Sequence, residues 1–207
     1  LSRSRVDTTT DAAVAAIQLN ASATLEADTV RGSAGIGLQV AGGVMSPVSG
    51  VRVTAGASYP LRADIAYLAG LTAADQALLL GNAKDTLVVT GGTLKAATVT
   101  ARSVLPWRVE NTVYIDSAAL LEVQPGAQLA AGAAVFIGFQ NGGRLSARGT
   151  AAGPVVFTSA DVTPANRWAG LVFRGTPADS SYLTNARVEY RRSGQYYYST
   201  LGVYLSH

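Results

Sequence analysis

The chain has 207 residues, of which 48% are apolar and only 14% charged, where a soluble domain usually carries about a quarter charged residues. Its net charge is +3, and Arg191-Arg192 is its only adjacent basic pair, so we expect no nucleic-acid partner. The absence of cysteine excludes disulfides, thiol catalysis and thiolate metal sites. The longest strongly apolar run, 129–139, contains two glycines and is too short for a membrane-spanning helix, which needs about 20 residues.

Residues 1–16 carry the weakest secondary-structure signal in the chain. Thr10 and Asp11 precede the stretch DAAVAAI and predict at most a short capped helix. From Ile17 onward, short segments rich in Val, Leu, Ile and Thr recur, bounded by Gly, Asn, Asp, Ser or Pro, and these predict strands. One interior segment is helix-like: in LTAADQALLL, Thr72 is placed to cap and Asp75 to favour the first turn. We expect this segment to be a loop excursion.

The predicted strands can be arranged in two interleaved ladders, whose members lie roughly 20 to 35 residues apart. The first ladder contains Ile17, Ile36, Leu61, Leu87, Val109, Val135, Leu171 and Val203. The second contains Val30, Val51, Leu79, Val99, Leu121, Val156 and Val188. Coils of variable length whose strands have similar composition are typical of a parallel β-solenoid, because loops extend outward without disturbing the stack. The sequence therefore predicts an all-β parallel solenoid of about eight coils.

Inward and outward alternation supports this architecture. In the segment 144–148, Leu145 and Ala147 share one face, with Arg144, Ser146 and Arg148 opposite. In the segment 186–191, the pattern places Ala186, Val188 and Tyr190 on one face and Arg187, Glu189 and Arg191 on the other.

An antiparallel sandwich is the rival architecture, but it requires hairpin turns, and only Asn141-Gly142-Gly143 fits one. A doubly wound α/β fold is excluded, because the sequence contains no repeated helical segments. The chain stops directly after a predicted strand, so we expect 1–207 to be one continuous segment of a longer solenoid.

The region 120–194 resembles a recurrent block of bacterial right-handed parallel β-helix surface proteins. The block contains an L-x-V-x-P-G turn, an L-x-A-x-G-T-x-x-x-P-V-x-F-T-S coil, a Trp-containing coil and a T-x-x-N-x-x-V-E-Y strand. The matching residues are Leu121, Val123, Pro125, Gly126, Leu145, Ala147, Gly149, Thr150, Pro154, Val155, Phe157, Thr158, Ser159, Trp168, Gly170, Leu171, Thr184, Asn185, Val188, Glu189 and Tyr190. Ala169 departs from the glycine common in that family. The resemblance implies a single-stranded right-handed β-helix in a secreted or cell-surface protein, and it implies no catalytic set.

Two kinds of side chain are candidates for function. Carbohydrate-active β-helices use clustered carboxylates for calcium together with a basic residue, but most of the 13 carboxylates here lie in turn signals, where Asp caps the backbone. Glu26 and Asp28 are predicted to share one strand face, and so are Arg187, Glu189 and Arg191. For either set, a surface ion pair or a solvated face is the simpler interpretation. Trp107 and Trp168 follow turns and are expected to be packing anchors. The remaining candidates for glycan binding are basic and aromatic: Arg187, Glu189, Arg191, Arg192, Tyr196, Tyr197 and Tyr198. The simpler interpretation of the tyrosines, which we favour, is that they cover an exposed flank of the solenoid or stack on the next coil.

The leading functional hypothesis is a non-catalytic structural or adhesive module, outside the cell or on a bacterial cell surface. Its expected partners are other parts of the same long chain, envelope proteins or cell-surface glycans. No metal or other cofactor is expected, and the segment is not expected to span a membrane. The alternative is a β-helix that binds or degrades a polysaccharide, as a lyase or hydrolase. Three carboxylates within roughly 6 Å of one another would favour that alternative.

Overall fold

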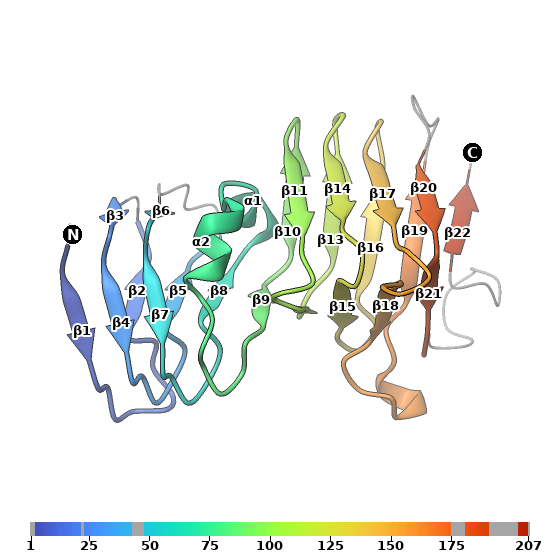
Figure 1. Cartoon of the computed structure of the whole chain (residues 1–207). Helices are drawn as coiled ribbons and strands as arrows, with labels where there is room; N and C mark the ends of the chain where they lie inside the picture. Colours follow the sequence, from blue (N-terminus) through green and yellow to red (C-terminus); the bar gives the residue numbers. More distant parts are fainter. Residues whose placement is uncertain (1–2, 22, 43–47, 175–180, 191–202, 207) are drawn as a thin grey trace. The chain divides into compact units, whose positions relative to one another are not determined.

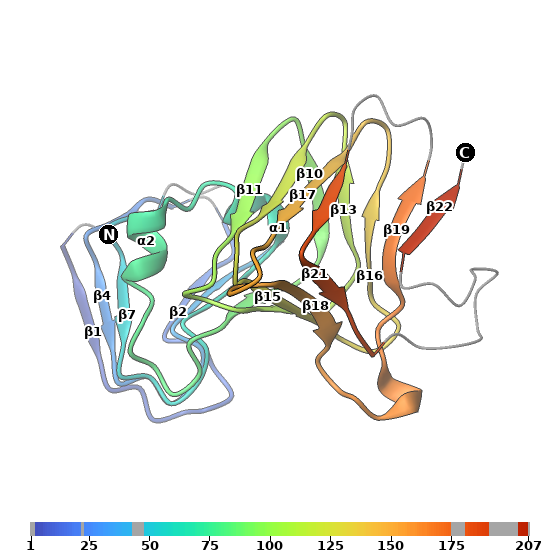
Figure 2. The same cartoon turned by 45° about the vertical axis from the view of Figure 1, so that its right-hand side comes forward.

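The computed structural model describes residues 3–21, 23–42, 48–174, 181–190 and 203–206. Parallel strands dominate these residues and wind into a right-handed β-solenoid of about 6 turns (Figures 1 and 2). The predicted parallel solenoid is therefore confirmed. The sequence predicted about eight coils, and the structure has about 6 turns. The chain divides into two compact units, Leu1–Thr90 and Gly91–His207.

The first unit contains three parallel sheets and two short helices. One sheet has the order β1–β4–β7, another pairs β3 with β6, and the third has the order β2–β5–β8–β9. The elements are β1 (Arg5–Asp7), β2 (Ile17–Leu19), β3 (Leu25–Glu26), β4 (Thr29–Arg31), β5 (Leu38–Val40), β6 (Val48–Ser49), β7 (Arg52–Thr54), β8 (Leu61–Ala63), α1 (Ile65–Leu68), α2 (Ala73–Ala77) and β9 (Leu87–Val89).

Both helices follow a side chain that caps them. The Asp64 carboxylate accepts the N–H of Tyr67 at 2.8 Å at the start of α1, and Thr72 and Asp75 form a reciprocal capping box at the start of α2. The segment expected to be a loop excursion therefore forms a short helix, with Thr72 as its cap and Asp75 in its first turn as predicted. The short helix expected after Thr10 is wrong, because Asp11 instead accepts the N–H of Ala13 at 2.8 Å in a local turn.

The second unit has three longer parallel sheets, which Figure 1 shows as strands stacked side by side. Their orders are β10–β13–β16–β19–β22, β11–β14–β17–β20 and β12–β15–β18–β21. The elements are β10 (Gly92–Lys95), β11 (Thr98–Ala101), β12 (Trp107–Val109), β13 (Val113–Asp116), β14 (Leu120–Val123), β15 (Gln128–Ala131), β16 (Phe136–Phe139), β17 (Arg144–Arg148), β18 (Val155–Ser159), a 3-10 turn (Pro164–Asn166), β19 (Gly170–Arg174), β20 (Tyr182–Thr184), β21 (Ala186–Val188) and β22 (Val203–Ser206).

Rows of like side chains fill the interior of the second unit. Ile115 pairs in register with Phe139, which pairs with Phe173, and the two phenyl rings stack with centroids 4.6 Å apart. Leu145 and Ala147 are 1% and 0% exposed, which confirms the predicted alternation in β17. Each buried Leu, Ile or Phe contributes about 1.5–3 kcal/mol, and a coil can bury these side chains only against its neighbours. The predicted packing roles of Trp107 and Trp168 are also confirmed, since both are buried.

Tight corners turn the chain from one sheet to the next. Ala96 and Asn141 adopt positive φ angles of 47° and 50° at two of these corners. At the corner between β16 and β17, a Cβ on Gly143 would overlap the backbone carbonyl of Ile115 in the preceding coil. Asn141-Gly142-Gly143 is therefore a corner between parallel sheets and not a hairpin.

The two predicted ladders are correct only in part. Ile17, Leu61 and Leu87 do lie in one sheet, but the strand between the first two contributes Leu38 rather than Ile36. Val30 likewise pairs with Val53 rather than Val51. A slip of two residues keeps the same face inward, so alternation alone does not reveal it.

Farther along the chain the predicted ladders change sheets. Val109 lies in β12, whereas Leu171 and Val203 pair with each other in β19 and β22. The pairing of Val99 with Leu121 is correct. Val188 pairs with Phe157 instead of Val156. Loops of unequal length between the strands hid the change of sheet.

Candidate functional site

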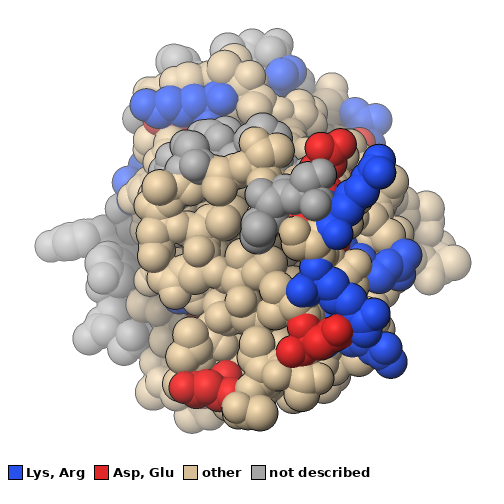
Figure 3. Space-filling view, turned by 90° about the vertical axis from the view of Figure 1, so that its left-hand side faces the viewer, with Lys and Arg blue, Asp and Glu red and all other residues tan. Residues whose placement is uncertain are grey.

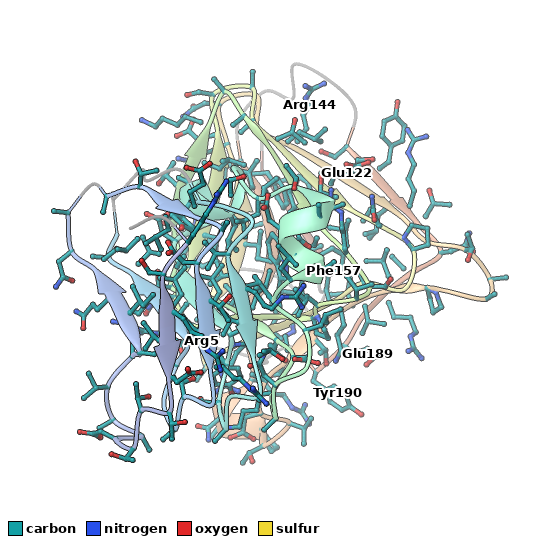
Figure 4. The ribbon with its side chains drawn as sticks, turned by 60° about the vertical axis from the view of Figure 1, so that its left-hand side comes forward. Arg5, Glu122, Arg144, Phe157, Glu189 and Tyr190 are labelled. Atoms are coloured by element: carbon teal, nitrogen blue, oxygen red, sulfur yellow. The ribbon has the colours of Figure 1, made fainter. Side chains whose placement is uncertain are left out.

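The described part of the predicted glycan-binding set lies on β21. Arg187 pairs with Val156 of β18, and Val188 pairs with the fully buried Phe157, so the Arg187 side chain faces outward. Arg187 Nε lies 3.3 Å from Glu189 Oε1, with the two side chains 61% and 32% exposed. This is the surface ion pair that the simpler interpretation of these charges predicted. Figure 4 shows Phe157, Glu189 and Tyr190, the last two as sequence neighbours at the end of this strand.

The buried side chain of Trp168 holds the backbone of this surface through a hydrogen bond. Its indole Nε1–H donates to the carbonyl of Glu189 at 2.8 Å, and its own backbone N–H donates to Ser159 Oγ at 3.2 Å. The side chain of Trp168 is 0% exposed. Because a buried indole N–H needs a partner, this bond sets the position at which the chain leaves β21.

The loop that precedes Trp168 brings a third charge to the same surface. The Arg167 guanidinium lies 5.7 Å from the centroid of the Tyr190 ring, and its Nε donates to the carbonyl of Val162 at 3.0 Å. Asp161 holds the loop through bonds from the N–H of Thr163 at 2.8 Å and the amide of Asn166 at 2.9 Å. These hydrogen bonds, first from Thr163 and then from Asn166, hold the pKa of Asp161 below its ordinary value.

Tyr190 departs from the predicted alternation. Its φ is 51°, so the chain turns at this residue, and its ring is 48% exposed rather than facing inward with Val188. Sequence reasoning did not identify Arg167 as part of this surface. It lies more than twenty residues before Tyr190, and no local pattern connects the two.

The structure therefore brings Arg187, Glu189, Tyr190 and Arg167 to one surface. The other predicted members, Arg191, Arg192, Tyr196, Tyr197 and Tyr198, lie outside the described residues. Exposed guanidinium groups bind carboxylates and sulfates, and an exposed phenol ring packs against the apolar face of a sugar. The arrangement suits binding, since the Glu189 carboxylate is already paired with Arg187.

The carboxylates of the first unit serve to join its own coils. Asp28 is buried and accepts the N–H groups of Ser4 at 2.7 Å and Glu26 at 3.2 Å. Glu26 and Asp28 therefore flank a corner, and the prediction that they share one strand face is wrong. Asp75 accepts the N–H of Gly50 at 3.0 Å. Burial acts to raise the pKa of Asp75, but hydrogen bonds from Thr72 and Gly50 outweigh it, so that pKa lies below its ordinary value.

Asp116 has a similar structural role in the second unit. It accepts hydrogen bonds at 3.0 Å from Gln140 and Asn141 of the next coil and from Ser117. These bonds, above all that of Gln140, hold the pKa of Asp116 below its ordinary value. Among the described residues, no three His, Cys, Asp or Glu side chains gather where they could hold a metal ion.

Residues 92–194 match a family model described as a pectate-lyase like beta helix domain. This part of the chain is similar to that family. The matched segment runs from β10 to β21 and includes Trp168, Arg187 and Glu189, so the expected β-helix is confirmed on independent grounds. No curated protein matches the chain, and no solved structure does. None of the helices in the described ranges is long and apolar enough to cross a membrane.

Proposed function

We propose that this chain is a non-catalytic structural or adhesive β-helix module of an extracellular or cell-surface protein. The main support for the proposal is that the buried carboxylates bond neighbouring coils to each other. Asp28, Asp75 and Asp116 each join one coil to another, so the acidic groups are committed to the stack. The low charge is consistent with this role, and Figure 3 shows mostly uncharged residues on the face seen there, with more of the charged groups on the right of the view than on the left.

The surface around Arg187 and Tyr190 is the proposed contact with cell-surface glycans or envelope proteins. Its support is an exposed guanidinium, an exposed ring and a backbone held by Trp168. Its described residues offer both groups that recognise acidic sugars: a planar cation for the carboxylate and an aromatic ring for the sugar face. The sequence of 191–198 contains further groups of both kinds.

A polysaccharide-degrading enzyme is the second candidate, and the pectate-lyase-like family match favours it. Such chemistry would need a calcium site built from carboxylates and a base positioned at the sugar. The two proposals differ in one observable, which is whether a bound polysaccharide is cut.

The test incubates the purified chain with polygalacturonate and with a neutral glucan, with and without calcium. We expect no new reducing ends and no unsaturated products, and we expect co-sedimentation with at least one polysaccharide. Arg187→Ala should weaken that binding. Arg5→Ala is the matched control, because Arg5 forms the same kind of exposed i, i+2 ion pair with Asp7, at 2.6 Å, in the first unit (Figure 4). Product formation that is lost on changing Glu189 to Gln would establish an enzyme and refute the proposal.

A further inference from the structure

The corner between β16 and β17 contains the pair Asn141-Gly142, which has no part in the proposed function. Asn141 and Gly142 have φ angles of 50° and 83°, and the N–H of Gly143 donates to the carbonyl of Gln140 at 2.9 Å across the turn. Asn141 is exposed to solvent. Among the six asparagines of the chain, it alone precedes a glycine, since the other five precede alanine, threonine or arginine.

An asparagine that precedes glycine can react with its own backbone in water. The amide nitrogen of the next residue loses its proton to hydroxide and bonds to the side-chain Cγ. The bond from Cγ to Nδ2 then breaks, and the nitrogen leaves as ammonia with a proton taken from water. Water opens either C–N bond of the resulting succinimide, which gives aspartate or isoaspartate. The reaction consumes one water, releases one ammonia and involves no change of oxidation state. Glycine favours it because no side chain obstructs the attacking nitrogen and its backbone is freer.

The Asp116 carboxylate of the preceding coil holds the reactive amide. Asn141 Nδ2 donates to Asp116 Oδ1 at 3.0 Å. Asp116 is only 7% exposed, and it also accepts hydrogen bonds at 3.0 Å from Gln140 and Ser117. Hydrogen bonds to an ionised acceptor are stronger than neutral ones. Because Nδ2 is the atom that has to leave, this bond must break before ammonia departs.

We propose that Asn141 is a site of spontaneous deamidation in the folded chain, at a rate controlled by its hydrogen bond to Asp116. The attacking atom is the nitrogen of Gly142, whose N–H donates to no acceptor among the described residues. The other reactant is water, which reaches the exposed turn. This inference is independent of the proposed function, because it uses no residue of the surface around Arg187.

Conversion of Asn141 to aspartate would replace an attraction by a repulsion. The amide now donates to Asp116, whereas a second carboxylate in its place could donate nothing and would carry the same charge. Like charges in contact disfavour each other's ionised form. The bond that joins the turn to the preceding coil would therefore be lost.

Conversion to isoaspartate would also lengthen the main chain of the turn by one atom. The turn is tied to the preceding coil on both sides, because the N–H of Gln140 donates to the carbonyl of Ile115 at 3.0 Å and the N–H of Arg144 to that of Ala119 at 2.9 Å. Arg144, labelled in Figure 4, is the first residue of β17. Between these two bonds, even a Cβ on Gly143 would overlap the Ile115 carbonyl. The added atom would have to displace one of these contacts.

The test incubates the purified full chain in mildly alkaline buffer and follows every asparagine by peptide mass spectrometry, with fragmentation that distinguishes aspartate from isoaspartate. We expect both products at position 141 before any other asparagine changes, and a rate that rises with hydroxide concentration. The same chain unfolded in urea gives the rate without the Asp116 bond. An Asn141 that stays intact in the folded chain, after a time that converts it fully in urea, would refute the site.

Two variants separate the effect of Asp116 from that of general unfolding. Asp116→Ala should accelerate the conversion of Asn141 about tenfold, the factor that corresponds to one hydrogen bond to a charged group. Asp75→Ala is the matched control, because Asp75 also joins two coils, through the N–H of Gly50 at 3.0 Å, but lies in the first unit. Its rate at Asn141 should equal that of the unchanged chain. Equal acceleration in both variants would overturn the role of Asp116. Circular dichroism verifies that both variants start folded.

The effect of the product on the fold is measured with Asn141→Asp. Aspartate, like asparagine, tolerates a positive φ, so this change isolates the new charge. We expect its urea midpoint at neutral pH to be lower than that of the unchanged chain. Asn20→Asp is the control, because Asn20 is exposed and aspartate keeps the acceptor for the Gln18 amide, so its midpoint should not change. Equal midpoints in the two variants would contradict the expected loss of the bond between the coils.

Discussion

Asn82 makes the sharpest prediction about how the coils of the first unit hold together. Its side-chain amide donates to the carbonyl of Val53 at 3.0 Å and to that of Leu79 at 2.9 Å. Its side-chain oxygen accepts the N–H of Gly56 at 3.0 Å. Two of these three bonds reach the preceding coil, so one side chain joins its own coil to the backbone at Val53 and Gly56.

Replacing Asn82 with Ala removes these three bonds to the backbone, together with a longer one, at 3.4 Å, from its amide to the Asp85 carboxylate. Each bond contributes about 1 kcal/mol net, so we expect the free energy of unfolding to fall by about 3 kcal/mol. Asn82→Asp keeps the acceptor for Gly56 but loses both donors, and it sets a second carboxylate beside Asp85. It should therefore destabilise the chain by at least as much as two lost bonds, about 2 kcal/mol.

The assay is urea unfolding followed by far-ultraviolet circular dichroism, because both tryptophans lie in the second unit. Hydrogen exchange at the Gly56 amide gives a local reading of the same contact. Asn20→Ala is the control, because Asn20 is exposed and bonds only the side chain of Gln18 among the described contacts, so its change should cost no more than about 0.5 kcal/mol. If Asn82→Ala were no more destabilising than Asn20→Ala, the reasoning about coil-to-coil bonds would be refuted.

Three further predictions concern stability. The pKa of Asp116 is lowered in the folded state, so the ionised carboxylate stabilises the fold. This stabilisation is complete above the ordinary pKa of about 3.9 and is lost as the pH falls toward the folded value. Urea midpoints measured across that range should therefore fall less in Asp116→Asn than in the unchanged chain. Ala55 has a φ of 55°, which glycine adopts without strain, so Ala55→Gly should raise the free energy of unfolding by about 0.5–1 kcal/mol and raise the thermal midpoint. Ala57 has no positive φ, so Ala57→Gly should lower the midpoint. Trp168→Phe leaves the Glu189 carbonyl without its indole donor and should cost about 1–2 kcal/mol in urea unfolding, and an unchanged midpoint would contradict the role assigned to that bond.

The sequence was sufficient to predict the class of fold because burial acts on every coil in the same way. Leu145 and Ala147 alternate with polar residues, and the structure buries both of them. The same signal could not fix register, as the exchange of Ile36 for Leu38 shows. What fixes the register is the corner, where Ala27 at a φ of 52° bonds the carbonyl of Ser49 in the next coil. Positive φ at alanine leaves no trace in the sequence, so this information was not accessible.

The candidate site was predictable only where its residues are close in sequence. Arg187 and Glu189 are two residues apart on one strand, and their pairing followed from the alternation. Arg167 comes to Tyr190 through a loop whose shape depends on Asp161, and no periodicity encodes that contact. Thr100, Glu122 and Ser146 lie on successive coils, so their alignment appeared only once the register was known.

In this solenoid, inward-facing side chains stabilise the fold, and outward-facing side chains are available for binding. Inward positions such as Leu121 and Leu145 are determined by burial, and a change there costs several kcal/mol. Outward positions such as Ser146 and Tyr182 bear little of that constraint, yet the strands hold them at a fixed spacing. A substitution at Ser146 should therefore change the free energy of unfolding little, whereas Leu121→Ala should lower it by several kcal/mol.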